Sequence, residues 1–195
     1  KLDRYMKDNL FDPLRMPDSG FRIGPAMRPR KAVVHVRNEA GGFTATDHEL
    51  NQAPEVFMGG GALYSTIGDY LRFARMILGH GALDGTRVLK SETVALMSRN
   101  AMGDVSCRPL ESQIPGRSTD MNFVDGMKWG LTFMINPHDF PGRRTAGSLS
   151  WGGLANSYYW IDPVKKVTGV WATQLLPFYD ARAVARFEDF ERGVY

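Results

Sequence analysis

One stretch of the sequence decides how the rest is interpreted: Ser148-Leu149-Ser150-Trp151-Gly152-Gly153-Leu154-Ala155-Asn156. An aromatic run of strand composition, residues 157–161, follows it. Glycines in a strand mark a bulge or a close approach of a ligand to the backbone. The pair would expose the N–H groups of Gly153 and Leu154 beside Trp151, as an oxyanion site requires. A tight bend between two strands is the other interpretation of the same pattern.

Composition limits the classes of function. The 195 residues are 43% hydrophobic and 23% charged, with a formal net charge of +3, which is typical of a globular protein. Without a basic cluster, nucleic acid is not an expected partner. No apolar run reaches the length of a membrane helix, so no membrane association is expected. A single cysteine, Cys107, and four scattered histidines predict neither a disulfide nor a metal site, and no cofactor is expected.

The first two thirds of the chain read as helices joined by irregular segments. Apolar spacing predicts a helix over residues 2–11, a short strand follows at 32–36, and residues 37–57 read as irregular. A helix is predicted from about 67 to 78, with Thr66 and Asp69 as a capping box and Gly79 as its stop. Ser91 is expected to cap a second helix through about Arg99, and residues 101–125 read as a long loop.

The last third is rich in strand patterns. Trp129, Leu131 and Phe133 alternate with polar or small residues, as in a half-buried strand. Residues 145–150 lead through the Trp-Gly-Gly element to a predicted strand at 156–161, the next strand is predicted at 167–174, and Asp180 opens a closing helix. Short connections make these strands antiparallel neighbours. The predicted fold class is α+β, an antiparallel sheet flanked by helices.

The chain contains no recognisable nucleophile for acyl transfer. No serine is followed three positions later by lysine, and no tyrosine stands two positions before asparagine. Ser98-Arg99-Asn100 lies at a predicted helix end, and residues 148–152 lack the first glycine of Gly-x-Ser-x-Gly. Tyr158 and Tyr159 could serve as acid–base groups, but core or sheet-face packing is the better interpretation. The oxyanion donors are thus plausible while the nucleophile is missing.

Several segments in order resemble the class C β-lactamase-related serine hydrolases, most closely their esterase-like branch. They are Leu2…Tyr5…Phe11-Asp12-Pro13-Leu14-Arg15-Met16-Pro17-Asp18-Ser19-Gly20-Phe21, Gly59-Gly60-Gly61-Ala62-Leu63-Tyr64-Ser65-Thr66-Ile67-Gly68-Asp69-Tyr70, Leu83-Asp84-Gly85-Thr86-Arg87-Val88-Leu89, Trp151-Gly152-Gly153 and Asp162-Pro163. The resemblance covers nearly the whole chain. Arg15 departs from it, because the family usually has glycine in its Pro-Leu-Gly-Met turn.

The resemblance implies that residues 1–195 are the C-terminal portion of one β-lactamase/penicillin-binding-protein-like domain, incomplete in this chain. Residues 1 to about 125 would form its helical and irregular region, and residues from about 126 to 195 its sheet strands and closing helix. The family's Ser-x-x-Lys and Tyr-x-Asn motifs would lie upstream of Lys1. Its Lys-Thr-Gly motif would fall on Trp151, Gly152 and Gly153, and the amide of Leu154 would complete the oxyanion hole.

The expected function is part of a serine hydrolase that cleaves carboxylic esters through an acyl-enzyme. Because Trp151 and Gly152 offer neither cation nor hydroxyl, uncharged acyl groups are favoured. Carboxylesterase therefore ranks above β-lactamase, with amide hydrolase or acyltransferase between them. A non-catalytic binding module is the alternative. The expected partners are the enzyme's N-terminal portion and a small-molecule ester. The chain alone should be inactive and poorly stable, and a soluble, cytoplasmic protein is favoured over a periplasmic or secreted one.

Overall fold

The computed structural model describes residues 1–114 and 116–195. Its largest sheet is antiparallel, with the strand order β5-β6-β7-β8-β9. These strands are β5 (Lys128–Trp129), β6 (Met134–Ile135), β7 (Leu149–Gly153), β8 (Ser157–Asp162) and β9 (Val167–Trp171). Each strand pairs with the one before it in sequence, as short connections require. The predicted antiparallel sheet flanked by helices is confirmed.

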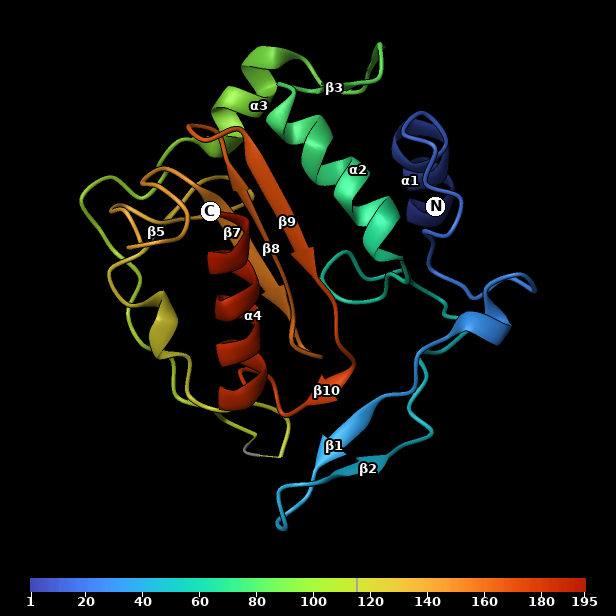
Figure 1. Ribbon diagram of the computed structural model, residues 1–195. Helices are drawn as coiled ribbons and strands as arrows, with labels where there is room; N and C mark the ends of the chain where they lie inside the picture. Colours follow the sequence, from blue (N-terminus) through green and yellow to red (C-terminus); the bar gives the residue numbers. More distant parts are fainter. Residues whose placement is uncertain (115) are drawn as a thin grey trace.

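Two helices cover the opposite faces of this sheet, α2 (Ile67–Leu78) and α4 (Ala181–Val194) (Figure 1). Side chains alternate between the two faces along β8. Ile161 belongs to the same core cluster as Ile77 of α2, whereas Trp160 packs against Phe187 of α4. The sheet is therefore the middle layer of three, and both of its faces are buried.

The remaining elements lie before the large sheet in sequence, except for one short strand. Strand β1 forms a hairpin with β2 and pairs in parallel with β10, so a segment near the start of the chain and one near its end meet in a second sheet. These elements are α1 (Leu2–Met6), η1 (Lys7–Phe11, a π-helical turn), η2 (Arg28–Arg30), β1 (His35–Arg37), β2 (Phe43–Ala45), β3 (Ala82–Leu83), β4 (Thr86–Arg87), α3 (Ser91–Ser98), η3 (Asn122–Val124) and β10 (Leu175–Leu176). Residues 37–57, predicted to be irregular, contain β2. The division of the chain near residue 125 stays a prediction.

The start of α2 matches the sequence pattern only in part. The Thr66 hydroxyl accepts the Asp69 N–H at 3.2 Å, so the predicted cap is present. The Asp69 carboxylate does not close the capping box. It accepts the Asp18 N–H at 2.8 Å and the Ser19 hydroxyl at 2.9 Å, which ties the preceding turn to the helix. Helix α3 differs as well, because Lys90 and not Ser91 is its N-cap, without a side-chain cap bond.

The strand predicted over residues 129–133 is wrong: β5 ends at Trp129 and β6 begins at Met134. The Gly130 N–H donates to the Phe133 carbonyl at 2.8 Å and closes a turn. A β-carbon on Gly130 would lie 2.2 Å from the Met97 carbonyl oxygen, so this close approach to α3 accepts only glycine. Strand β9 likewise ends at Trp171, three residues before the predicted end.

Candidate functional site

Strand β7 carries the Trp-Gly-Gly motif on a backbone edge that is open on one side. All five of its residues pair with β8, so the two glycines form no bulge. On the other side, β6 pairs only with Leu149 and Ser150. Within residues 1–114 and 116–195, no strand therefore covers that edge from Trp151 to Gly153. Unpaired strand edges present N–H and C=O groups that can bind a further chain or a ligand.

Leu154 lies in the turn that follows this open edge. The Asn156 N–H donates to the Gly153 carbonyl at 3.0 Å, and Asn156 has a φ of 57°. A turn closed by a residue of positive φ is the usual three-residue hairpin connection. The Leu154 N–H makes no hydrogen bond in the described part of the chain, and its side chain is exposed. The predicted oxyanion donor is thus a free N–H at the end of an open edge, and its role stays a prediction.

Asn156 fixes the position of this turn. Its side-chain amide donates to the carbonyls of Leu175 and Pro177, each at 2.7 Å. Its carbonyl oxygen accepts the Tyr158 hydroxyl at 2.7 Å and the Asp180 N–H at 3.0 Å. All four bonds are made by a fully buried side chain. The hairpin is therefore anchored to the segment that precedes α4, a role that sequence reasoning missed; asparagine in a tight turn was the only signal available.

The two glycines of the motif have different surroundings. A β-carbon on Gly152 would lie 2.7 Å from the ring of Tyr158, so this glycine makes room for a buried aromatic side chain. A β-carbon on Gly153 would meet its nearest neighbour at 3.8 Å, an ordinary contact. Gly152 is therefore required by packing, whereas the exposed Gly153 leaves space beside the open edge.

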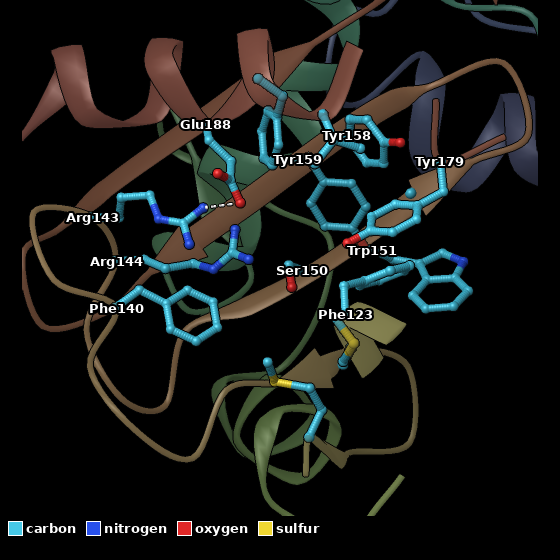
Figure 2. Close-up of a pocket in the computed structure, with 15 residues that line it drawn as sticks. Phe123, Phe140, Arg143, Arg144, Ser150, Trp151, Tyr158, Tyr159, Tyr179 and Glu188 are labelled. Atoms are coloured by element: carbon cyan, nitrogen blue, oxygen red, sulfur yellow. Dashed lines mark ion pairs between the residues drawn. The ribbon is translucent and has the colours of Figure 1, made fainter. Parts of the chain in front are cut away.

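Trp151 and Gly152 form part of the wall of a cavity of about 260 Å³ that lies beneath α4 (Figure 2). The Trp151 ring is held edge-on to Trp129, with ring centroids 4.7 Å apart. The other aromatic wall residues are Phe123, Phe140, Tyr158, Tyr159, Tyr179 and Phe187. A concave, mostly aromatic surface with a few polar groups is the usual form of a small-molecule site.

The two tyrosines weighed as acid–base groups are packed in aromatic clusters. Tyr158 contacts Phe187, and Tyr159 contacts Tyr70 with ring centroids 5.2 Å apart. Burial raises the pKa of both Tyr158 and Tyr159, and it raises the pKa of Tyr70 to about 12. Phenols with raised pKa values stay protonated at neutral pH, so these side chains are poor bases there.

Of the serines in the described residues, neither Ser148 nor Ser150, which precede the Trp-Gly-Gly motif, is arranged as a nucleophile. The hydroxyls of Ser148 and Ser150 are buried without a hydrogen-bond partner, so neither has a base in contact. Ser98 is the last residue of α3. In the same part of the chain, no three His, Cys, Asp or Glu side chains gather as a metal site would require. None of its helices is both long and apolar enough to cross a bilayer.

Comparison with known proteins gives a consistent family. The family described as Beta-lactamase matches residues 1–192. An uncharacterised protein of Mycobacterium tuberculosis is 29% identical over 194 residues, covering 94% of this chain and 46% of that protein. Monacolin J acid methylbutanoyltransferase of Aspergillus terreus is 27% identical over 206 residues, covering 100% of this chain and 49% of that enzyme. The chain thus spans about half the length of these relatives.

Solved structures of other proteins superpose on this fold. An Aspergillus terreus simvastatin synthase mutant superposes with a TM-score of 0.83 at 27% identity, covering 100% of this chain and 49% of that one. EstCE1, described as a hydrolase with promiscuous acyltransferase activity, superposes with a TM-score of 0.68 at 17% identity, covering 98% of this chain and 51% of that one. At that lower identity the similarity concerns the fold alone.

Proposed function

This chain belongs to the beta-lactamase family, and on that premise we propose that it is part of a serine enzyme that cleaves carboxylic esters through an acyl-enzyme. Its contribution is the oxyanion strand β7 and the aromatic wall beside it. These 195 residues contain no Ser-x-x-Lys motif. In this proposal the serine and its lysine base belong to the upstream portion of the natural polypeptide.

The observation that carries the proposal is the free N–H of Leu154 after the open edge of β7. When a serine oxygen attacks an ester carbonyl, the carbonyl oxygen becomes negative. The C–O bond to the alcohol then breaks, and the serine proton passes through the base to the leaving oxygen. A fixed N–H that points at the developing charge lowers the barrier of this step. Water or an alcohol then takes the acyl group from the serine.

The motif favours an uncharged acyl group next to the reacting carbonyl. Trp151 supplies an aromatic surface, and neither Trp151 nor Gly152 supplies a cation or a hydroxyl. Among related proteins, the methylbutanoyltransferase at 27% identity moves such a group. Transfer to an alcohol is therefore the second candidate function, ahead of amide or β-lactam hydrolysis.

Leu154→Pro tests the donor directly. Proline removes the N–H, and it suits the second position of a turn such as that of residues 153–156. We expect kcat/KM for a p-nitrophenyl ester to fall by about 100-fold or more in the natural polypeptide. The control, Leu154→Ala, keeps the N–H and removes only an exposed side chain, so it should stay within about threefold of wild type. Equal activity of the two variants would rule out Leu154 as the donor.

Labelling with a fluorophosphonate tests the rest of the proposal. The natural polypeptide that contains residues 1–195 should take up one probe, and digestion should place the adduct on a serine upstream of Lys1. Adding an alcohol acceptor and measuring the new ester separates acyl transfer from hydrolysis. An unlabelled natural polypeptide would favour the non-catalytic binding module.

A further inference from the structure

The cavity beneath α4 has a polar end that the proposed ester chemistry does not use. Arg143, Arg144 and Ser150 lie at this end, and the Arg143–Glu188 ion pair closes it (Figure 2). Ser150 stands four residues before Leu154, which is about 13 Å along an extended strand. The polar end is therefore separate from the Leu154 amide.

Two buried hydrogen-bond donors at this end lack partners. The Ser150 hydroxyl and the Arg144 Nε–H are each without a hydrogen bond in the described residues, and both side chains are more than nine-tenths buried. A buried donor left unpaired costs about 1–3 kcal/mol, so such groups usually meet a ligand, an ion or water. We therefore expect an acceptor group in the cavity to bind both donors.

The two arginines at this end are paired unevenly. Arg143 has a carboxylate oxygen of Glu188 at 2.9 Å and one of Glu191 at 3.6 Å. Arg144 has the weaker pairing, since its nearest carboxylate oxygen, on Glu191, lies 3.5 Å away and is shared with Arg143. Burial lowers the pKa of Arg144, as expected for a guanidinium whose partners compensate its charge incompletely.

We propose that this cavity binds a small carboxylic acid with an apolar body, whose carboxylate accepts hydrogen bonds from Arg144 Nε and the Ser150 hydroxyl. The carboxylate supplies a negative charge beside the weakly paired Arg144 and two acceptor oxygens for the unpaired donors. The apolar body lies against Phe123, Trp151 and Tyr179, at the opposite end of the cavity. Phe140, stacked under both guanidiniums with its ring centre 5.0 Å from each, holds the two arginines in place.

Titration calorimetry of the natural polypeptide with phenylacetate tests this site, with phenylacetamide as the uncharged counterpart. We expect phenylacetate to bind at least tenfold more tightly. Ser150→Ala removes one hydrogen bond to a charged group and should weaken phenylacetate binding by about tenfold. It removes an unpaired hydroxyl, so the fold should be unaffected. Arg144→Gln should weaken binding more, whereas Arg186→Gln, a change at an exposed arginine outside the cavity wall, should bind as wild type does.

Three outcomes would overturn the proposal: no measurable phenylacetate binding, equal binding of the amide, or wild-type binding by both Ser150→Ala and Arg144→Gln. The Leu154→Pro variant separates this site from the ester chemistry. It should lose turnover and keep phenylacetate binding, so either proposal can fail without the other.

Discussion

The hydroxyl of Tyr195 donates a hydrogen bond to Asp162 at 2.9 Å, and so joins the end of α4 to the last residue of β8. The same hydroxyl accepts the Trp160 indole N–H at 3.1 Å. Asp162 is fully buried and also accepts the N–H groups of Thr145, Val164 and Lys165. The Asp162 carboxylate is thus hydrogen-bonded to the segment before β7, to the β8–β9 turn and to Tyr195.

Tyr195→Phe should destabilise the fold by about 1–3 kcal/mol, because the Trp160 N–H loses its acceptor and Asp162 loses a donor. The free energy of unfolding from urea titration would measure this. Tyr5→Phe is the matched control, since Tyr5 is 64% exposed, and it should change stability by less than about 0.5 kcal/mol. Equal stability of the two variants would mean that the Tyr195 side chain is not fixed in solution.

Asn156→Ala should cost about 3 kcal/mol, because it breaks four buried hydrogen bonds and places alanine at a positive φ. Tyr158→Phe, which removes one of the four bonds, should cost about 1 kcal/mol. Urea unfolding of both variants gives the comparison. If the two losses were similar, Asn156 would not be the anchor of the β7–β8 turn.

The sequence was sufficient for features that depend on neighbours along the chain. The bounds of α2 follow from apolar periodicity, the Thr66 cap and Gly79, and they match the structure. The order of the strands in the large sheet follows from short connections. The three-residue turn after β7 places Leu154 next to the glycine pair because both lie within one hairpin.

Features that depend on distant residues could not be predicted in this way. Asn156 bonds to carbonyls 19 and 21 residues away, and Arg144 meets a glutamate 47 residues away. No local pattern encodes these pairings. The alternation around Gly130 is typical of a strand, and no local pattern marks the turn found there. That turn depends on a tertiary contact, the close approach of Gly130 to the Met97 carbonyl. The nucleophile stays a prediction, since these 195 residues contain no Ser-x-x-Lys motif.

Arg15→Gly should stabilise the fold by about 0.5–1 kcal/mol. Arg15 has a φ of 53°, which costs a residue with a side chain about 1–2 kcal/mol, while glycine loses about 0.5–1 kcal/mol in backbone entropy. Arg15 is also where the resembling family usually has glycine. Thermal unfolding checks the change, with Arg15→Ala as the control that keeps a β-carbon and should not gain stability.

Gly152→Ala and Gly153→Ala should separate packing from substrate contact. The first brings a methyl group within 2.7 Å of the Tyr158 ring and should cost about 1–3 kcal/mol. The second meets nothing closer than 3.8 Å and should leave stability within about 0.5 kcal/mol of wild type. If the open edge of β7 binds the substrate, Gly153→Ala should still lower ester turnover. Urea unfolding and p-nitrophenyl ester hydrolysis would be measured on both variants.

Acid should weaken the fold partly through Asp180. A hydrogen-bonded ion pair with Arg37 lowers the pKa of this carboxyl; burial opposes that shift, and the Ala183 N–H adds to it. Because the folded pKa lies below the unfolded value of about 3.9, the carboxylate stabilises the fold fully above that value. The contribution is lost as the pH falls through the folded pKa.

Urea midpoints measured from about pH 6 down to about pH 3 should therefore decline less steeply in Asp180→Asn than in wild type. Asp125→Asn, a change at an exposed aspartate, should retain the wild-type decline. Parallel curves for all three proteins would show that the Arg37–Asp180 pair does not contribute to acid sensitivity.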